Sequence, residues 1–285
     1  MNRIFHKTAN LLYLLFFLGI SLFMGYHHEP FSDEAQAYLI ARDASLWDIV
    51  KDVARAEGHP LLWYIWLKVL LASGLTYSYI FLASIIPNFL GVWLFIKKAP
   101  FPPLVRYLFP LTYFIFYQYN IVARGYSFWL LFISLAAIYY PKRKIHPWQY
   151  IIILMVLGQI EIYTFLLSGG IFAMGLYEDW KAKEVNLKIL SIMAIYGIVT
   201  IIMLYPHADN RYLYLLTYKY EVIIVSIVRT FSCGLITLNS YDFKEPIYIL
   251  IGCVYFFVTF VELFSIYRKT TILLLIPLIA FSCIV

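Results

Sequence analysis

Residues 78–96 read SYIFLASIIPNFLGVWLFI, a stretch in which no side chain is charged, and Lys97 and Lys98 follow it directly. A helix rises about 1.5 Å per residue, so this stretch is long enough to cross a hydrocarbon core about 30 Å thick. A helix that is hydrophobic on every side lies either in a protein core or in a membrane. The stretch therefore predicts a membrane-spanning helix that ends at a polar boundary.

Similar apolar runs occupy much of the chain. Hydrophobic residues make up 63% of the 285 positions and charged residues only 13%, whereas a soluble domain has about 25% charged residues. The further runs cover 10–26, 103–121, 124–140, 149–163, 164–178, 189–205, 247–267 and 271–285. These observations predict an all-α polytopic membrane protein, with one transmembrane domain over residues 1–285 and about 8–10 spans.

The basic residues favour a membrane topology rather than nucleic-acid binding. The net charge is +6, but the Lys and Arg residues cluster between the apolar runs. The clusters are Lys97-Lys98, Lys142-Arg143-Lys144, Lys181/Lys183/Lys188 and Arg268-Lys269. Cytoplasmic loops carry such an excess of positive charge. We therefore expect a multi-pass protein of the plasma (inner) membrane with a cytoplasmic N-terminus and no nucleic-acid partner. The first apolar run lacks a cleavage site and is expected to be a retained anchor.

Residues 61–74 are apolar, but as a helix they would cover only about 21 Å, which is short for a span. Their crossing would also leave the lysine pair at 97–98 outside, against the positive-inside rule. We expect this segment to be interfacial or re-entrant, so that residues 27–77 form one external loop. A second external segment is expected at 206–246. The last run reaches Val285 without a polar flank, as in a truncated chain or one that ends at the membrane face.

Acidic residues gather in the first part of the external loop. Seven of the sixteen acids in the chain lie there: Glu29, Asp33, Glu34, Asp43, Asp48, Asp52 and Glu57. Ser45 and Asp48 have the spacing of a helix-capping box. The apolar residues between 46 and 53 share one helical face, with charged residues on the other. This pattern predicts an amphipathic helix on the membrane surface, and its acids then form a solvated face.

Two polar clusters, one near each end of this stretch, are candidate site residues. Asp33-Glu34 follows the exit of the first helix, and Glu57-Gly58-His59-Pro60 lies where the chain returns to the membrane. Acids and histidines at a membrane mouth can act as a general base, relay protons or bind a metal. Asp33, Glu34, Glu57 and His59 are therefore candidate ligands of a divalent metal, the one cofactor that the sequence leaves open.

A third cluster, YQYNIVARGY at residues 117–126, lies at the second expected external turn. Its Arg124 stands on the outer side, where the positive-inside rule disfavours a basic residue. Arg124 either contacts lipid headgroups or pairs with a substrate phosphate, a task that suits a planar guanidinium with five donors. Tyr126 lies in the same turn and is a candidate substrate contact.

Together these segments resemble the GT-C class of membrane glycosyltransferases. The likeness is to the family of protein O-mannosyltransferases and the lipid A aminoarabinose transferase (glycosyltransferase family 39). The likeness covers about residues 5–140. The segments that carry it are Pro30–Tyr38, Glu57–Tyr64 with its His-Pro pair, and the Arg-bearing turn. Helix hairpins with short loops are a further shared feature. Position 61 is Leu rather than the family's second Pro, and Ala123–Tyr126 lacks its second acid. We do not expect residues 1–285 to contain the soluble C-terminal domain that many members carry.

The resemblance implies a GT-C-like helix bundle with inverting glycosyltransferase activity. The donor would be a polyprenyl-phosphate-linked sugar, and the acceptor an extracytoplasmic glycan, lipid or protein. In the family the acid of the first loop is the general base for the acceptor hydroxyl. That role maps onto Asp33, and its neighbour Glu34 is the second catalytic candidate.

The resemblance also implies a group that stabilises the departing lipid phosphate. Arg124 is the candidate for this task, with Lys68 and Arg211 as weaker ones. Glu57 and His59 would bind the substrate, orient the base or hold a metal.

Two other classes of protein remain open from the sequence. A transporter or lipid-linked sugar flippase would carry ionisable groups in the middle of its helices, and Glu161 and Glu262 are the main candidates for such positions. A non-catalytic assembly partner would bind no polyprenyl phosphate at all.

Overall fold

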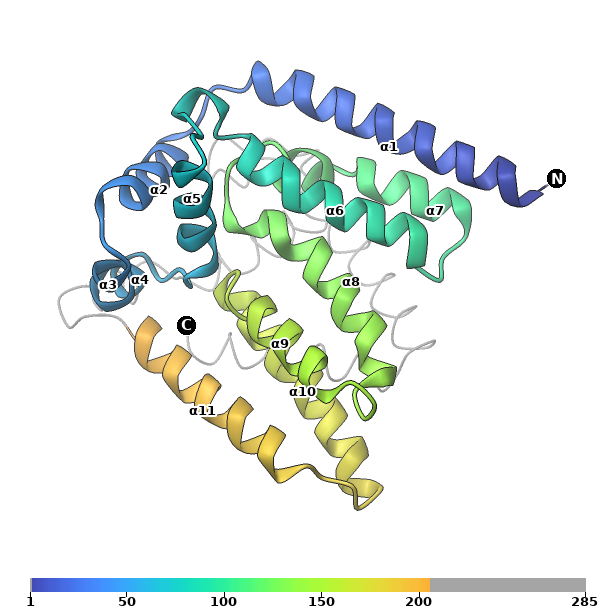
Figure 1. Ribbon diagram of the computed structural model, residues 1–285, viewed down its shortest axis with the longest axis vertical. Coiled ribbons are helices and arrows are strands. Elements are labelled where there is room, and N and C mark those ends of the chain that lie inside the picture. The colour runs from blue at the N-terminus through green and yellow to red at the C-terminus, as the bar shows by residue number, and fades with distance from the viewer. Residues whose placement is uncertain (1, 206–285) are drawn as a thin grey trace, which may run out of the picture. The chain divides into compact units, whose positions relative to one another are not determined.

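The computed structural model describes residues 2–205, with side chains from Thr8 onward. Every regular element in this part of the chain is a helix and none is a strand, which confirms the all-α prediction (Figure 1). The second external segment, the last two apolar runs, Arg211 and Glu262 lie outside the described residues.

Three helical stretches are long and apolar enough to cross a membrane. They are Thr8–Tyr26 within α1 (Asn2–Tyr26), Tyr77–Lys98 ending with α6 (Leu82–Lys98), and Leu187–Leu204, which is α11. The Asn186 side chain caps α11 by accepting hydrogen bonds from the backbone N–H groups of Lys188 and Ile189. The prediction of membrane-spanning helices is confirmed to this extent, and the larger number of spans stays a prediction.

The run at 103–121 is not the single helix that the sequence predicts. It divides into α7 (Pro103–Leu108), a 3-10 turn at Phe109–Leu111 and a π-helical turn at Phe114–Gln118. Pro110 has no N–H to donate and its ring disfavours a continuous helix, so the chain leaves the helical path there. The next run begins with a 3-10 turn at Gly125–Phe128 and continues as α8 (Trp129–Tyr139).

The two shorter runs after α8 form α9 (Pro147–Leu157) and α10 (Ile162–Lys181). The runs at 149–163 and 164–178 predict a bend near Tyr163, but the break lies at residues 158–161. Glu161 has extended backbone angles, and its N–H donates to Thr164 Oγ1 at 2.9 Å, so α10 begins directly after Glu161. The acid at 161 therefore lies at a helix end and not in the middle of a helix.

The first loop is helical where its pattern predicts a helix, as α3 (Leu46–Asp48), a π-helical turn at Ile49–Val53 and α4 (Ala54–Glu57). A further helix, α2 (Ser32–Asp43), precedes them and was not predicted from the pattern. The capping box is present: Asp48 N donates to Ser45 Oγ at 3.2 Å and Ser45 N donates to Asp48 Oδ2 at 3.1 Å. Hydrogen bonds from Ser45 lower the pKa of Asp48. Ile49 is fully buried and Lys51 is exposed, as an amphipathic helix requires, although Leu46 is also exposed.

The short apolar segment that follows the loop is α5 (Leu62–Ala72), about 16 Å long. At its start, Leu62 N donates to Gln159 O in the break between α9 and α10. Just past its end, the ring of Tyr77 packs on Tyr38 of α2 with centroids 5.2 Å apart. The start of α5 thus contacts the break between α9 and α10, and the residues just past its end contact α2. The interfacial or re-entrant placement of this segment stays a prediction.

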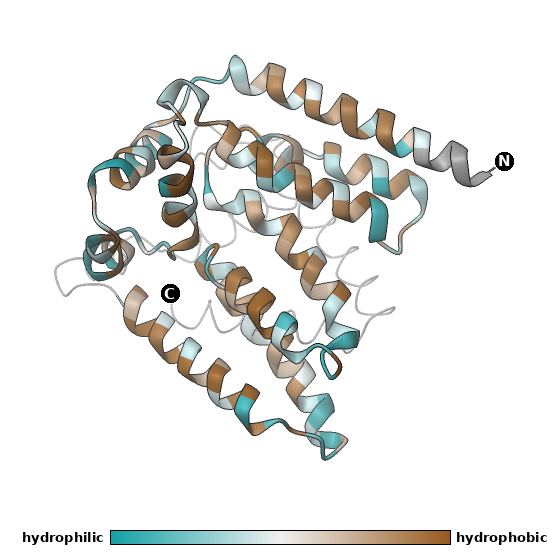
Figure 2. Ribbon diagram, in the orientation of Figure 1, coloured by the Kyte–Doolittle hydropathy of each residue, from teal (hydrophilic) through white to brown (hydrophobic). Residues whose placement is uncertain are grey.

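The polar residues gather at two opposite ends of the long helices, and the middles are hydrophobic (Figure 2). One end carries α2 to α5 and the break at 158–161. At the other end, Lys98 and Pro141 line one apolar cavity, and Arg143 Nη2 donates to Glu178 Oε2 at 2.8 Å. The basic clusters of the described residues are therefore at the end away from the first loop.

Helices α6 and α8 extend between these two ends and pack closely against each other (Figure 1). A Cβ atom on Gly91 of α6 would lie 2.7 Å from the backbone nitrogen of Leu131 in α8, so only glycine allows this approach. Ser84 Oγ donates to Val122 O at 2.9 Å, and Asn88 Nδ2 donates to Ile115 O at 3.0 Å. These bonds hold the turn at 114–124 against α6.

Candidate functional site

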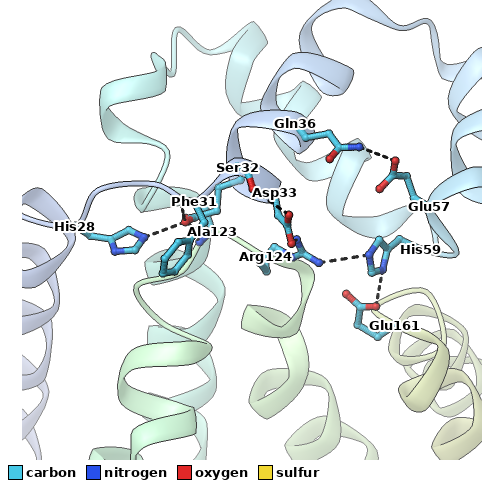
Figure 3. A network of polar contacts seen from close by, with 11 residues as sticks. His28, Phe31, Ser32, Asp33, Gln36, Glu57, His59, Ala123, Arg124 and Glu161 are labelled. Carbon is cyan, nitrogen blue, oxygen red and sulfur yellow. Dashed lines mark hydrogen bonds and ion pairs between the residues drawn. The ribbon is translucent and has the colours of Figure 1, made fainter. Parts of the chain in front are cut away.

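Glu34 anchors the first loop to the turn at 120–125. Its side chain is fully buried, and Oε1 accepts a hydrogen bond from Ala123 N at 2.6 Å. Oε2 accepts from Phe31 N at 2.8 Å and lies 2.9 Å from His28 Nε2 (Figure 3). These contacts occupy both oxygens, so the predicted catalytic acid Glu34 is placed as a bridge between segments, beside the pocket but not lining it.

This turn places the Arg124 side chain next to Asp33. The turn is held by backbone and side-chain bonds: Arg124 N donates to Ser84 Oγ at 3.2 Å, and Asn120 Nδ2 donates to Ser21 Oγ at 2.6 Å. Arg124 Nη1 then donates to Asp33 Oδ2 at 2.8 Å (Figure 3). The Arg124 side chain is 17% exposed and that of Asp33 65%, so the base candidate faces outward and the cation lies deeper.

His59 is brought to the same place by the turn after α4. Gly58 takes the left-handed conformation, with φ of 67°, which ends the helix and turns the chain toward Pro60. His59 Nδ1 lies 2.8 Å from Glu161 Oε2, and Arg124 Nη2 lies 3.4 Å from His59 Nε2. Asp33, Arg124, His59 and Glu161 thus form one continuous chain of polar contacts (Figure 3).

A pocket of about 100 Å³ opens at this chain of contacts. Gln36, one turn after Asp33 on α2, donates from Nε2 to Glu57 Oε1 at 2.7 Å on its wall. Apolar and aromatic groups line the rest. The lining residues are Asp33, Gln36, Ala37, Glu57, His59, Trp63, Tyr64, Arg124, Gly125, Ile160 and Glu161.

The charges around the pocket are three carboxylates and one guanidinium. Burial lowers the pKa of Arg124, but Tyr126, Asp33 and Glu161 raise it by more, so its pKa lies above the ordinary value and the group stays cationic. Burial raises the pKa of Tyr64 and of Tyr126, so both phenols keep their protons at neutral pH. Of these two tyrosines only Tyr64 lines the pocket. The pocket can therefore offer a fixed cation, an exposed carboxylate and one neutral phenol to a ligand.

Glu161 is the site residue that the sequence interpretation placed wrongly, as a mid-helix acid. It lies at the start of α10 at the pocket, with only 10% of its side chain exposed. A signal was present, because Gly158 and Gln159 interrupt the apolar run and Thr164 stands three residues after the acid. Gln36 was missed as well, although its spacing from Asp33 places both on one face of α2.

The four candidate metal ligands are not gathered at one point. Glu34 belongs to the buried bridge with His28, Glu57 pairs with Gln36, and His59 pairs with Glu161. Within residues 2–205, no group of three or more His, Cys, Asp or Glu side chains is placed to hold a metal ion. As arranged, these four side chains do not converge on one divalent metal.

The remaining candidates differ in their distance from the pocket. The ring centroid of Tyr126 lies 5.7 Å from the guanidinium carbon of Arg124, within reach of a cation–π contact. Lys68 does not line the pocket, and its charge acts on Asp43. Of the two weaker phosphate candidates, Lys68 is thus placed elsewhere and Arg211 is not among the described residues.

No protein family model matches the chain, and no curated protein or solved structure is significantly similar to it.

Proposed function

We propose that this protein is an inverting membrane glycosyltransferase of the GT-C type. It would move a sugar from a polyprenyl-phosphate donor to an acceptor at the extracytoplasmic face. One observation carries the proposal: the Asp33 carboxylate and the Arg124 guanidinium, from segments far apart in the sequence, meet at 2.8 Å on one pocket. This transfer needs both a base and a phosphate-binding cation at one site, the base on the acceptor side of the anomeric carbon and the cation on the phosphate side.

Asp33 is the general base in this proposal. Its side chain is the exposed member of the pair, so an acceptor hydroxyl can approach it. As the acceptor oxygen bonds to the anomeric carbon, its proton passes to Asp33. The bond between the anomeric carbon and the phosphate oxygen breaks on the opposite face, and its electron pair leaves with the phosphate.

Arg124 stabilises the negative charge that develops on the departing phosphate. The guanidinium has five N–H donors, of which one contacts Asp33 and another His59. Tyr126 also forms a side-chain hydrogen bond with the guanidinium. The donors beyond these three contacts can form charge-assisted bonds with phosphate oxygens, which are about twice as strong as neutral ones. A fixed cation in a largely buried position acts on that charge with little loss to solvent.

The position of the pocket also supports the proposal. It lies at the helix ends near the exit of α1, and the basic clusters lie at the opposite ends. Under the positive-inside rule the pocket would face the extracytoplasmic side of the inner membrane. A polyprenyl chain could then stay in the bilayer while its phosphate reaches Arg124.

The test is sugar transfer by the full chain in proteoliposomes. We would offer a panel of undecaprenyl-phosphate sugars and measure the release of undecaprenyl phosphate. Replacing the base, Asp33→Asn, is expected to lower the rate about 10²-fold or more. Asp43→Asn is the matched control, because Asp43 is an exposed acid on the same helix that pairs only with Arg42 among the contacts described. If the Asp33→Asn variant transferred sugar at the wild-type rate, the proposal would be wrong.

The transporter or flippase remains the second candidate from the sequence. Ionisable groups in the middle of helices would favour this class, but Glu161 lies at a helix end and not in the middle of a span. Flux of a solute or a lipid-linked sugar through vesicles, without any release of polyprenyl phosphate, would favour the transporter over the transferase.

A further inference from the structure

Glu161 is a buried acid in the pocket to which the proposed reaction gives no task. It lies in the break between α9 and α10, far in sequence from the loop and the turn that supply Asp33, His59 and Arg124. Its backbone N–H is bonded to Thr164, which fixes the start of α10. A carboxylate in so buried a position is costly unless it is hydrogen-bonded, and its partner is His59.

The contacts of His59 determine which of its nitrogens carries the proton. Arg124 has only donors, so His59 Nε2 must accept the bond from Arg124 Nη2 at 3.4 Å. The proton of a neutral ring is then on Nδ1, and Nδ1 donates to Glu161 Oε2 at 2.8 Å. A carboxylate bonded to one ring nitrogen selects this tautomer and fixes the ring plane.

The result is that two groups hold the guanidinium of Arg124 from different sides. Asp33 binds Nη1 and His59 binds Nη2, so neither end of the planar group can rotate freely (Figure 3). The ring of Tyr126 lies near the guanidinium carbon as well. Without Glu161, the imidazole could turn or take the other tautomer, and its N–H would then repel Arg124.

The backbone keeps Glu161 close to this turn. A Cβ atom on Gly125 would lie 3.1 Å from Ile160 O and 3.3 Å from Glu161 Oε1, so the turn and the helix break are in tight contact. Glycine at position 125, directly after Arg124, thus leaves room for the Glu161 carboxylate. This contact is independent of the hydrogen bonds, and it places the same two segments together.

We propose that Glu161 is a positioning residue of the phosphate site. Through His59 it sets the orientation of Arg124, so that the free donors of the guanidinium are presented to the phosphate of the donor. This inference rests on the proposed function, because the ligand of Arg124 is taken to be that phosphate.

The first test is the binding of farnesyl phosphate to the full chain in detergent, measured by calorimetry. Glu161→Leu removes the acceptor and the charge, and is expected to raise the Kd about tenfold, as for loss of a hydrogen bond to a charged group. Glu161→Gln keeps the shape and loses the charge, and should raise it about threefold. Adding Glu161→Leu to His59→Gln should cause little further loss, because the two residues act in series.

The second readout is the tautomer of His59, followed by ¹⁵N NMR of labelled histidine and assigned by comparison with His59→Gln. The wild type should show the proton on Nδ1, and both Glu161 variants should shift population toward Nε2. Glu178→Gln is the matched control, since Glu178 is on the same helix and pairs with Arg143 at its other end. That variant should change neither the Kd nor the tautomer.

The outcomes separate this inference from the proposed function. If farnesyl phosphate binds the wild type and both Glu161 variants equally, or if the tautomer does not change, the positioning role is wrong while the transferase stands. If the wild type binds no farnesyl phosphate, the phosphate site itself is wrong and both proposals fall. Should Glu161→Leu fail to fold, Glu161→Gln decides by the same two measurements.

Discussion

At the scale of single residues, the neighbours Asp33 and Glu34 occupy opposite environments. Asp33 is exposed and faces Arg124, whereas Glu34 is buried and accepts backbone hydrogen bonds from two segments. Adjacent residues on a helix point about 100° apart, so one acid can face a pocket while the other faces the core. The pair that looks like a catalytic dyad in sequence is therefore one exposed carboxylate and one structural bridge.

This difference predicts that Glu34→Gln acts on stability. The amide keeps one acceptor oxygen but turns an NH₂ group toward a backbone donor, which leaves buried groups unsatisfied. We expect the free energy of unfolding to fall by about 2–3 kcal/mol, measured by SDS titration in detergent micelles. Glu29→Gln is the control, because Glu29 is exposed in the same loop, and it should change by less than about 0.5 kcal/mol. Unchanged stability with lost sugar transfer would instead assign Glu34 a catalytic task.

At the scale of the elements, prolines, glycines and caps decide where the helices end. Pro110 divides the run at 103–121, and Gly58 ends α4 just before His59. The break at 158–161 separates α9 from α10 and places Glu161 at the pocket. Each of these interruptions lies within or beside a segment that reaches the pocket. The helix breaks thus place His59, Arg124 and Glu161, while α2 and α5 supply other lining residues.

The contact of α6 with α8 predicts a strong effect for Gly91→Ala. The added methyl would lie 2.7 Å from the backbone nitrogen of Leu131, so the helices must move apart. Overpacking of this kind costs about 1–3 kcal/mol, which SDS titration would show as lower stability. Gly19→Ala on α1 is the matched control: no atom lies within 4 Å of its Cβ position, and alanine favours a helix. If both variants were equally stable, the close approach of α6 and α8 would be wrong.

At the scale of the whole molecule, charge and hydropathy define two ends of the described helices. The first-loop helices and the pocket lie at one end, and the ion pairs of Arg143 and Lys144 with Glu178, Asp179 and Glu184 lie at the other. The positive-inside rule would place these two ends on opposite sides of the membrane, and this topology stays a prediction.

That topology predicts the accessibility of single cysteines. With the native cysteines replaced by serine, Lys51→Cys in the first loop should react with an impermeant maleimide in sealed, right-side-out vesicles. Lys181→Cys, at the end of α10, should react only after permeabilisation, and both positions are exposed in the structure. Labelling of both sites from the same side would contradict the proposed orientation.

Much of the protein follows from its sequence alone. Apolar runs free of charge predict the long helices, because a helix in lipid must satisfy its backbone internally and bury no charge. The Ser45–Asp48 capping box is equally local, since both partners lie within one turn. Asp33, His59 and Arg124 were found because polar residues are rare and costly beside a membrane.

Only the tertiary structure brought those residues together, as the stretch at 78–96 shows. Its composition predicts a helix long and apolar enough to cross a membrane, but only the structure shows that its Ser84 and Asn88 hold the turn that carries Arg124. The contacts of Arg124 with Asp33 and of His59 with Glu161 join residues about a hundred positions apart. Such pairs depend on helix breaks and on packing between helices, which no local period or cap encodes.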